Sequence, residues 1–308
     1  MCYSAQVWAD YDAYVRAYGA DIDIRTFVEL YVEKREGAKL KTPRAMDRSF
    51  HGNAGPEFAK IEGLVEAIHA QDIAQMEQEL FKQTKRLADA QRKLATKPTK
   101  AAEKDAEIAP RKIEQLKGRL TNLKRKEDRP SDHRIFPGMY APVMVWDDGR
   151  RVVKPMRYQC RPAGKTASYD RRYPGTYNAR RDNLEGFWRG QFGATHAVMV
   201  ADRFYENVAT DEGNQVLEFV PRTHEPMLIA CLWSEWHDPK GEEPSLLSFA
   251  AITDEPEPEV AEAGHDRTVI NLKEEHLDAW LNPAGDLEAL YRLLDDKQHP
   301  YYEHRKAA

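Results

Sequence analysis

The sequence has little cysteine, and the cysteines it has follow no paired pattern. Three cysteines occur among 308 residues, and none belongs to a CxxC pair. An odd number without paired spacing argues against a disulfide framework and against a structural zinc site. We therefore expect a reducing compartment, the cytoplasm, where thiols stay free. Nothing in the sequence points to a metal ion or to another cofactor.

Long apolar runs are also absent. No segment approaches the roughly 20 apolar residues that a membrane-spanning helix needs. Asp10, Asp12 and Arg16 interrupt any signal pattern near the start. We therefore expect no membrane partner. Hydrophobic residues make up 41% of the chain and charged residues 31%, which is typical of a soluble globular protein with a charged appendage.

The chain has no net positive charge overall, but one segment carries a local excess of Lys and Arg. The formal net charge is −5, whereas residues 150–189 hold eleven Lys and Arg against three Asp and Glu, a local balance of +8. Several aromatic residues, such as Tyr158 and Trp188, lie in the same segment. Cations for phosphates and flat rings for bases are what a groove for single-stranded DNA needs. A solvated charged surface would give the same count, so both interpretations stay open.

The first half of the chain is predicted to be helical. Apolar spacing predicts two helices over residues 5–36, interrupted near Gly19 and ended near Gly37, followed by a loop over residues 38–56. Between residues 59 and 128, heptad-like apolar steps form two runs separated by Pro98. Because proline interrupts helices, this pattern predicts an inserted antiparallel helical hairpin, a coiled coil. The hairpin is a candidate for a protein partner or for self-association.

From residue 135 onward, short strands are predicted. Apolar runs at 144–146 and 152–153 flank Asp147-Asp148-Gly149, which predicts a β-hairpin. Further runs at 197–200, 216–220, 227–230 and 246–252 predict more strands, and helices follow over 274–281 and 286–294. The expected fold class is α+β, with a mixed or antiparallel sheet forming an open barrel with flanking helices. Residues 1–58 and 129–308 would form one domain, interrupted by the hairpin at 59–128.

Three polar segments follow predicted strands or loops in this second half. The first is Asn-Ala-Arg, which begins at Asn178. The second is Phe-Tyr-Glu, which ends at Glu206, and the third is His-Asp-Arg, which begins at His265. Strand ends and loops are where a rigid scaffold commonly presents reactive groups. Taken singly, an asparagine that caps a turn, an ion-paired glutamate and a surface histidine are the simpler explanations.

The second residue, Cys2, could supply a nucleophile to accompany these polar segments. Removal of Met1 would leave a free α-amine and a thiol on adjacent carbons, with reference pKa values of about 8 and about 8.5. An aldehyde can form an imine with the amine, after which the thiol closes a thiazolidine. By its position alone, Cys2 is an ordinary terminal residue.

Taken together, these segments resemble those of the SRAP family, the SOS response-associated peptidases that process abasic sites. Its members begin Met-Cys and carry Asn-Ala-Arg, Phe-Tyr-Glu and His-Asp-Arg segments in this order, as this chain does at residues 178–180, 204–206 and 265–267. The resemblance covers roughly residues 1–55 and 130–308. Tyr3-Ser4 in place of Gly-Arg, Asn207 in place of Trp and Thr268-Val269 in place of Met-Pro mark a divergent member.

The resemblance implies a covalent sensor of abasic sites in single-stranded DNA that acts in the SOS response to DNA damage. Cys2 would form a thiazolidine crosslink with the sugar aldehyde, Glu206 would shuttle protons, His265 would assist ring opening and reversal, and Asn178 would orient the reactants. The activity would be peptidase-like in removing Met1 and lyase-like in its imine chemistry. The protein would be associated with the nucleoid when bound to DNA. The expected DNA contacts are Arg157, Tyr158, Arg161, Arg180 and Arg181.

Two other functions stay open from the sequence. The first is a cysteine-type peptidase, in which Cys2 attacks a peptide and His265 serves as its base. The second is a non-catalytic scaffold that binds nucleic acid or a protein partner through the helical hairpin.

Overall fold

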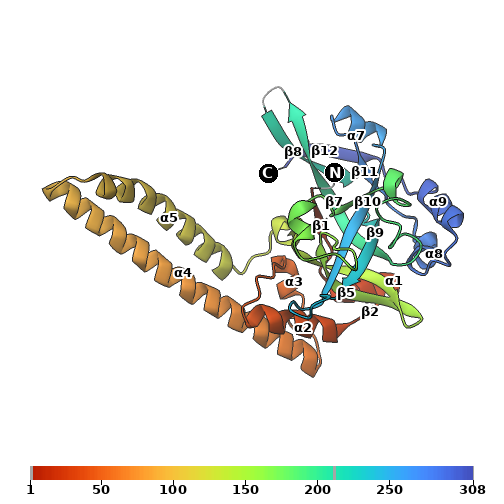
Figure 1. Cartoon of the computed structure of the whole chain (residues 1–308), viewed down its shortest axis with the longest axis horizontal. Helices are drawn as coiled ribbons and strands as arrows, with labels where there is room; N and C mark the ends of the chain where they lie inside the picture. The colour runs from red at the N-terminus through yellow and green to blue at the C-terminus, as the bar shows by residue number, and fades with distance from the viewer. Residues whose placement is uncertain (1–2, 211–212, 308) are drawn as a thin grey trace.

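The computed structural model describes residues 3–210 and 213–307; Met1, Cys2, Asp211, Glu212 and Ala308 lie outside this part. In the described residues, twelve strands belong to one mostly antiparallel sheet with helices around it. A long helical hairpin projects from this body (Figure 1). The predicted α+β class with an inserted helical hairpin is confirmed.

The strands are β1 (Ser4–Val7), β2 (Asp21–Ile22), β3 (Arg134–Ile135), β4 (Tyr140–Asp147), β5 (Arg150–Tyr158), β6 (Asn178–Arg180), β7 (His196–Thr210), β8 (Gly213–Pro221), β9 (Met227–Trp236), β10 (Leu246–Asp254), β11 (Thr268–Val269) and β12 (Tyr302–Lys306). The α-helices are α1 (Tyr11–Tyr18), α2 (Ile24–Arg35), α3 (Arg44–Arg48), α4 (Pro56–Thr96), α5 (Lys100–Lys124), α6 (Tyr169–Arg172), α7 (Pro258–Glu262), α8 (Leu277–Leu281) and α9 (Leu287–Asp295).

Five strands close a ring of pairings. β4 pairs with β5 and β7, β9 pairs with β7 and β10, and β10 returns to β5 in the one parallel contact of the ring. The predicted turn joins β4 to β5, with positive φ angles of 47° at Asp148 and 79° at Gly149. This conformation matches the right-handed twist of the two strands, so the turn fixes their register.

The ring strands are buried on both faces, which explains their continuous apolar runs. Along β7, Val198 and Val200 belong to one apolar cluster, which includes residues of α1, α2 and α8. The alternate residues Ala197 and Met199 belong to a second cluster, shared with β1, β3 and β12. The rigid centre of the molecule therefore lies along β7 and its neighbours.

The start of the chain differs from its prediction. Residues 5–7 were expected in a helix, but they form β1, which lies between β7 and β3. The polar and apolar residues alternate along Ser4-Ala5-Gln6-Val7, and the pairing with β7 supplies backbone hydrogen bonds that a short isolated helix lacks. Tertiary pairing thus overrides the local helical spacing, and α1 begins only at Tyr11.

The hairpin consists of α4 and α5, separated at the predicted break around Pro98. The first turns of α4 bury Ile61 and Val65 in the main core, whereas farther out Ala90 and Ile113 are buried where α4 meets α5. At 41 residues, α4 is about 60 Å long. Most of the hairpin therefore extends beyond the body as an arm, as Figure 1 shows.

The body end of the arm is fastened by hydrogen bonds. The Arg44 guanidinium donates to the carbonyl oxygens of Asn122 and Leu123 at the end of α5. The buried guanidinium of Arg125 then binds the carboxylate of Asp132, with Nη2 2.5 Å from Oδ1. These bonds satisfy orphan carbonyl groups at a helix end and fix where the arm leaves the body. Among the described residues, no helix is long and apolar enough to cross a membrane.

We expect Phe50→Ala to lower the free energy of unfolding by about 3–5 kcal/mol, because it removes a fully buried aromatic ring. The Phe50 side chain is 0% exposed, and its ring lies 4.9 Å from Tyr11 and 5.6 Å from Phe27 between centroids. Urea unfolding followed by circular dichroism would measure the change. Phe81→Ala is the matched control, since Phe81 is 73% exposed on the arm and its loss should leave the stability nearly unchanged.

Candidate functional site

β7 carries Glu206 next to the first described residue of the chain. The antiparallel pairing of β1 with β7 places Ser4 opposite Tyr205 and Ala5 opposite Phe204. The Tyr3 amide nitrogen consequently lies 3.3 Å from Glu206 Oε2 and 3.2 Å from the Tyr205 carbonyl oxygen. Cys2, the predicted nucleophile, lies outside the described residues.

Glu206 and His265 form a buried pair. His265 Nε2 lies 3.4 Å from Glu206 Oε2, and the Glu206 side chain is only 1% exposed. Burial raises the pKa of Glu206 well above its ordinary value and lowers the pKa of His265. Both shifts favour the neutral forms, because a buried site solvates charge poorly. Burial therefore shifts the pair toward a carboxylic acid beside an uncharged imidazole.

The second ring nitrogen of His265 identifies the tautomer. Nδ1 lies 2.9 Å from the Arg267 carbonyl oxygen, which can only accept a hydrogen bond, and 3.3 Å from the Arg267 amide nitrogen, which can only donate one. The shorter contact favours a proton on Nδ1. In the neutral ring Nδ1 then carries the proton, and Nε2 is left as an acceptor that faces Glu206. The pair can thus hold one proton on the carboxyl group and receive another on the imidazole, which is the arrangement that general acid–base chemistry requires.

Glycine at position 264 allows His265 to approach β7. Gly264 adopts a positive φ of 89°, and a Cβ atom there would lie 3.0 Å from Val208 Cγ1, two residues beyond Glu206. The His265 amide also donates to the Val260 carbonyl of α7, at 3.1 Å. A side chain at 264 would thus strain the backbone and push the loop away from the carboxyl group.

Asn178 lies on a separate element and lines a pocket. β6 runs parallel to β10, with Asn178 opposite Ala251. Asn178 is 7% exposed, and among the described residues its amide nitrogen and oxygen have no hydrogen-bond partner. The pocket has a volume of about 360 Å³ and is lined by Arg172, Tyr173, Pro174, Gly175, Thr176, Asn178, Arg180, Asn183, Phe187 and Trp188.

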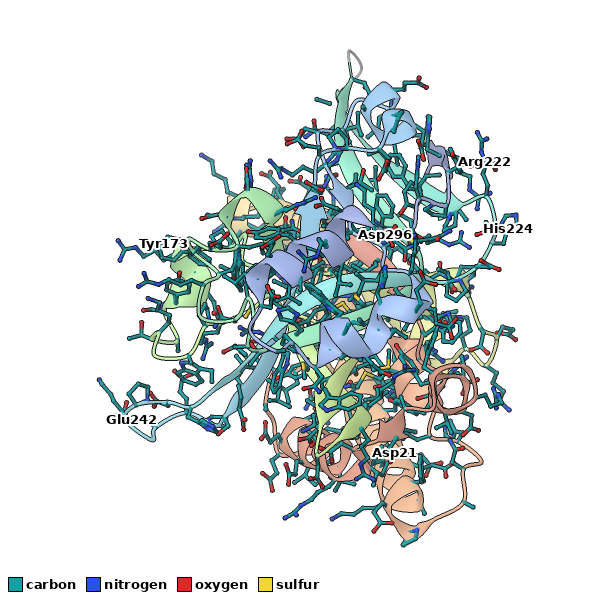
Figure 2. The ribbon with its side chains drawn as sticks, turned by 90° about the vertical axis from the view of Figure 1, so that its right-hand side faces the viewer. Asp21, Tyr173, Arg222, His224, Glu242 and Asp296 are labelled. Atoms are coloured by element: carbon teal, nitrogen blue, oxygen red, sulfur yellow. The ribbon has the colours of Figure 1, made fainter. Side chains whose placement is uncertain are left out.

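Buried polar atoms without hydrogen-bond partners among the described residues suit this pocket to a polar ligand. Thr176 Oγ1 also lacks a partner, and leaving such groups unsatisfied costs about 1–3 kcal/mol each. A bound polar group would remove that cost. Tyr173, labelled in Figure 2, lies at the periphery of the body, so the pocket is near the surface.

The structure places β6 near the His265 segment without joining Asn178 to the buried pair. The residues after β6 and the His-Asp-Arg segment meet where Arg267 Nη2 lies 3.9 Å from Asp182 Oδ2. β6 and β11 also both pair with the end of β10. Glu206 and His265 are therefore in direct contact, whereas Asn178 lies on β6, which pairs with β10, and has no hydrogen bond to either among the described residues.

Three of the predicted DNA contacts are largely buried and contact other residues of the protein. Tyr158 is 0% exposed and stacks on Phe249, so its ring offers no exposed face to a base. Arg157 and Arg161 both bind the carboxylate of Asp170, at 2.8 Å and 2.5 Å, and their side chains are 15% and 8% exposed.

The other two predicted contacts lie closer to the surface. Arg181 pairs with Asp254 and Asp295 and is 23% exposed. Arg180 pairs with Asp182 and is 52% exposed, the most accessible of the four predicted arginines. The predicted arginines are thus paired with acids of their own segment, Asp170 and Asp182, and with two acids from distant segments, Asp254 and Asp295.

Arg134 was not predicted, yet it lies next to the start of the chain. Its guanidinium is 3.7 Å from the Tyr205 ring centroid, and its Nε lies 2.9 Å from Ser4 Oγ. Arg134 belongs to β3, about 130 residues from Ser4, so no sequence spacing could reveal this contact. Thr176 was missed too, because a single threonine carries no recognisable pattern.

Fold and site together define an α+β protein whose strands present a buried acid–base pair beside the start of the chain. The model of the family "SOS response associated peptidase (SRAP)" matches residues 91–306. The chain therefore belongs to the SRAP family. No curated protein matches the sequence significantly.

Three solved structures are similar at low sequence identity. A protein from Bordetella bronchiseptica is 20% identical, with a TM-score of 0.48, covering 59% of this chain and 90% of that chain. A protein from Bacteroides thetaiotaomicron is 15% identical, with a TM-score of 0.49 and coverages of 57% and 77%. A phage-related protein from Bordetella bronchiseptica is 19% identical, with a TM-score of 0.44 and coverages of 60% and 85%.

We expect the stability of Glu206→Gln, relative to that of the wild type, to increase as the pH rises from 5 to 8. The folded protein keeps the Glu206 proton above the ordinary pKa, whereas the unfolded chain releases it, so rising pH favours unfolding of the wild type. Glutamine removes this contribution. Thermal melts should show a Tm difference that grows by a few degrees, since about 1 kcal/mol shifts Tm by about 2–4 °C in domains of 150–250 residues.

Glu288→Gln is the matched control for this melt series. The Glu288 side chain is 86% exposed, and its difference from wild type should stay constant with pH. A pH-independent difference for Glu206→Gln would show that the buried carboxyl group ionises as it does in the unfolded chain.

Proposed function

We propose that this protein senses and processes abasic sites in single-stranded DNA, with Cys2 forming a thiazolidine crosslink after removal of Met1. One observation carries the proposal: in a member of the SRAP family, the buried Glu206–His265 pair lies against the amide of Tyr3. Cys2 is bonded directly to Tyr3, so its amine and thiol would react within reach of this pair.

The proposed reaction condenses one aldehyde with one aminothiol and releases one water molecule. The ring-opened sugar exposes an aldehyde at C1′, and the α-amine of Cys2 adds to it to give a carbinolamine. Protonation of the carbinolamine hydroxyl lets it leave as water, which produces the imine. The thiol sulfur then adds to the imine carbon while the nitrogen takes up the proton, and the thiazolidine ring closes.

Each member of the buried pair has a matching role. The raised pKa of Glu206 favours a protonated carboxyl group, which could give its proton to the departing hydroxyl. The neutral imidazole of His265 would accept a proton from the amine or thiol and return it later. Asn178, with both amide atoms unpartnered in its pocket, would hold the sugar or a neighbouring group by neutral hydrogen bonds.

DNA contacts are proposed chiefly for the accessible cations around the pocket. Arg180 lines the pocket and is half exposed, so it can reach a phosphate by exchanging its bond to Asp182. Arg181 could do so only by leaving Asp254 and Asp295. Arg157 and Arg161 would contribute indirectly, since their shared bond to Asp170 fixes the loop that carries Tyr173.

A peptidase activity is the second candidate, favoured by the description of the family. In this proposal Cys2 would attack a peptide carbonyl, with His265 as its base. Release of Met1 would be the simplest reaction of this kind. Hydrolysis of a peptide panel without any adduct on abasic DNA would favour it over the crosslink.

We expect Cys2→Ala to abolish a denaturant-stable adduct between the protein and a single-stranded oligonucleotide carrying one abasic site. Denaturing gel electrophoresis and intact-mass analysis would detect the adduct and show whether Met1 is absent. Cys160→Ala and Cys231→Ala are matched controls that should keep it, because both thiols are 0% exposed and burial raises the pKa of Cys160 to about 12. An adduct that survives in Cys2→Ala would refute the proposed chemistry.

Glu206→Gln should slow adduct formation by roughly 10²-fold or more, the usual contribution of a positioned general acid. Single-turnover kinetics at saturating abasic DNA would measure the rate, and anisotropy with undamaged single-stranded DNA would show unchanged affinity. Equal rates for the two proteins would remove Glu206 from the mechanism.

A further inference from the structure

The far end of the helical arm carries a concentration of positive charge that folding does not require. Residues 80–119 hold twelve Lys and Arg against five Asp and Glu, a formal balance of +7, whereas the remaining 268 residues have a balance of −12. The arm is held together by its internal apolar contacts, including Ala90, Ala102, Ala109 and Ile113. Most of these cations lie outside this seam on the surface of the arm, although Arg86 on α4 bonds to Asp105 on α5.

Most of these cations have no carboxylate to neutralise them. Four of the five acidic residues in the segment already pair with Arg86, Arg92, Arg111 or Lys117. Seven cations have no carboxylate within 4.0 Å in the described part of the chain, and all of them are exposed. They are Lys85, Lys93, Lys97, Lys100, Lys104, Lys112 and Arg119. In residues 150–189, by contrast, most of the predicted contacts are paired with acids.

The unpaired lysines gather where the two helices join. Five of the seven cations lie between residues 85 and 104, around the connection from α4 to α5. A groove of about 300 Å³ lies there, lined by Lys82, Lys85, Arg86, Asp89, Ala90, Lys93, Thr99, Ala101, Ala102 and Asp105. Asp89 and Asp105 are the groove's acids, and both are already paired with arginines. Figure 1 shows this tip as the part of the molecule farthest from the sheet.

The composition of the tip distinguishes between kinds of anionic partner. Six of the seven unpaired cations are lysines, which act as point charges and lack the planar fork with which arginine reads bases. Phe81 is the only aromatic residue in the segment, so the tip has no stacking platform for unpaired bases. Lysines without aromatic rings suit the sugar-phosphate backbone of a duplex, whose charge density is about one per 1.7 Å of axis.

We propose that the arm is a second DNA-binding element, which holds the phosphate backbone of duplex DNA while the body handles the single-stranded lesion. This inference rests on the proposed function, which makes DNA the ligand of the body. The basic part of α4, residues 80–96, is about 25 Å long and reaches along about 7 base pairs at about 3.4 Å each. Two linked contacts on one DNA molecule raise the effective concentration of the lesion at the site.

The test compares two full-length variants on an undamaged duplex of about 30 base pairs, a length that exceeds the reach of α4. The arm variant replaces five lysines by glutamine: Lys85, Lys93, Lys97, Lys100 and Lys104. The control variant replaces five exposed cations of the body by glutamine: Arg16, Arg25, Lys39, Lys240 and Arg292. Fluorescence anisotropy over a series of salt concentrations gives the affinity and its salt dependence, and circular dichroism verifies that both variants keep their helices.

We expect the arm variant to bind the duplex at least about tenfold more weakly at 0.1 M salt, with the slope of log K against log salt reduced by about 4, close to 0.9 for each phosphate contact. The control variant should match the wild type. Both variants should crosslink a short single-stranded abasic oligonucleotide at the wild-type rate, because the arm does not contact Glu206 or His265.

Three outcomes would overturn the inference. The arm variant could keep the wild-type duplex affinity and slope, or the control variant could lose as much affinity as the arm variant. The arm variant could also bind the duplex normally but lose binding to phosphatidylserine vesicles, which would make a lipid surface the partner. The duplex assay needs no abasic site, so it gives its answer even if the crosslinking assay shows no adduct in any variant.

Discussion

The pairing of β1 with β7 is the contact on which the site depends. Four residues at the start of the chain join an interior strand of the sheet, and their backbone hydrogen bonds fix the register to within one residue. A slip by one residue would turn Ser4 and Gln6 toward the apolar cluster that now contains Ala5 and Val7. The same register sets the Tyr3 amide beside Glu206. The register of β1 against β7 therefore determines both the packing of the core and the position of the candidate site.

Burial then gives the site its chemistry. Glu206 and His265 are ordinary titratable residues whose pKa values are shifted toward the neutral forms by exclusion of water. The loop that carries His265 can come close enough only because residue 264 is glycine. Asn178 shows the complementary effect, since a buried amide without partners is costly until a ligand satisfies it. Both features indicate a site arranged for a polar substrate.

The helical arm shows how a large insertion is accommodated without disturbing this arrangement. The chain leaves β1, passes through α1 to α5 and returns in β3, which pairs directly with β1. Arg44 and Arg125 fasten the returning segment to the body. Since the two ends of the insertion lie close together, its length adds little strain to the sheet. The arm is thus free to carry a charge distribution opposite to that of the rest of the chain.

Much of the fold and part of the site could be predicted from local pattern. Strands with continuous apolar runs, the Asp148-Gly149 turn and the break at Pro98 follow from residue preferences that act over a few positions. The helix predicted from residue 5 was wrong at its start, because the helical spacing over residues 5–36 is a local signal and β7 is a distant partner. Four polar positions, Cys2, Asn178, Glu206 and His265, were recognised by their order, and the structure shows two of them in contact.

What the sequence alone determined is the inventory: which groups can titrate, where helices stop, and how charge is distributed along the chain. Only the tertiary structure decided which charges remain available. Arg157 and Arg161 bind Asp170, and the ring of Tyr158 is packed in the core. All three belong to the basic, aromatic segment that the sequence suggested for DNA binding. The physical reason is that ion pairing and burial depend on distance in space: the acid that binds Arg157 and Arg161 comes from their own segment, whereas the ring that stacks on Tyr158 is that of Phe249, far along the chain.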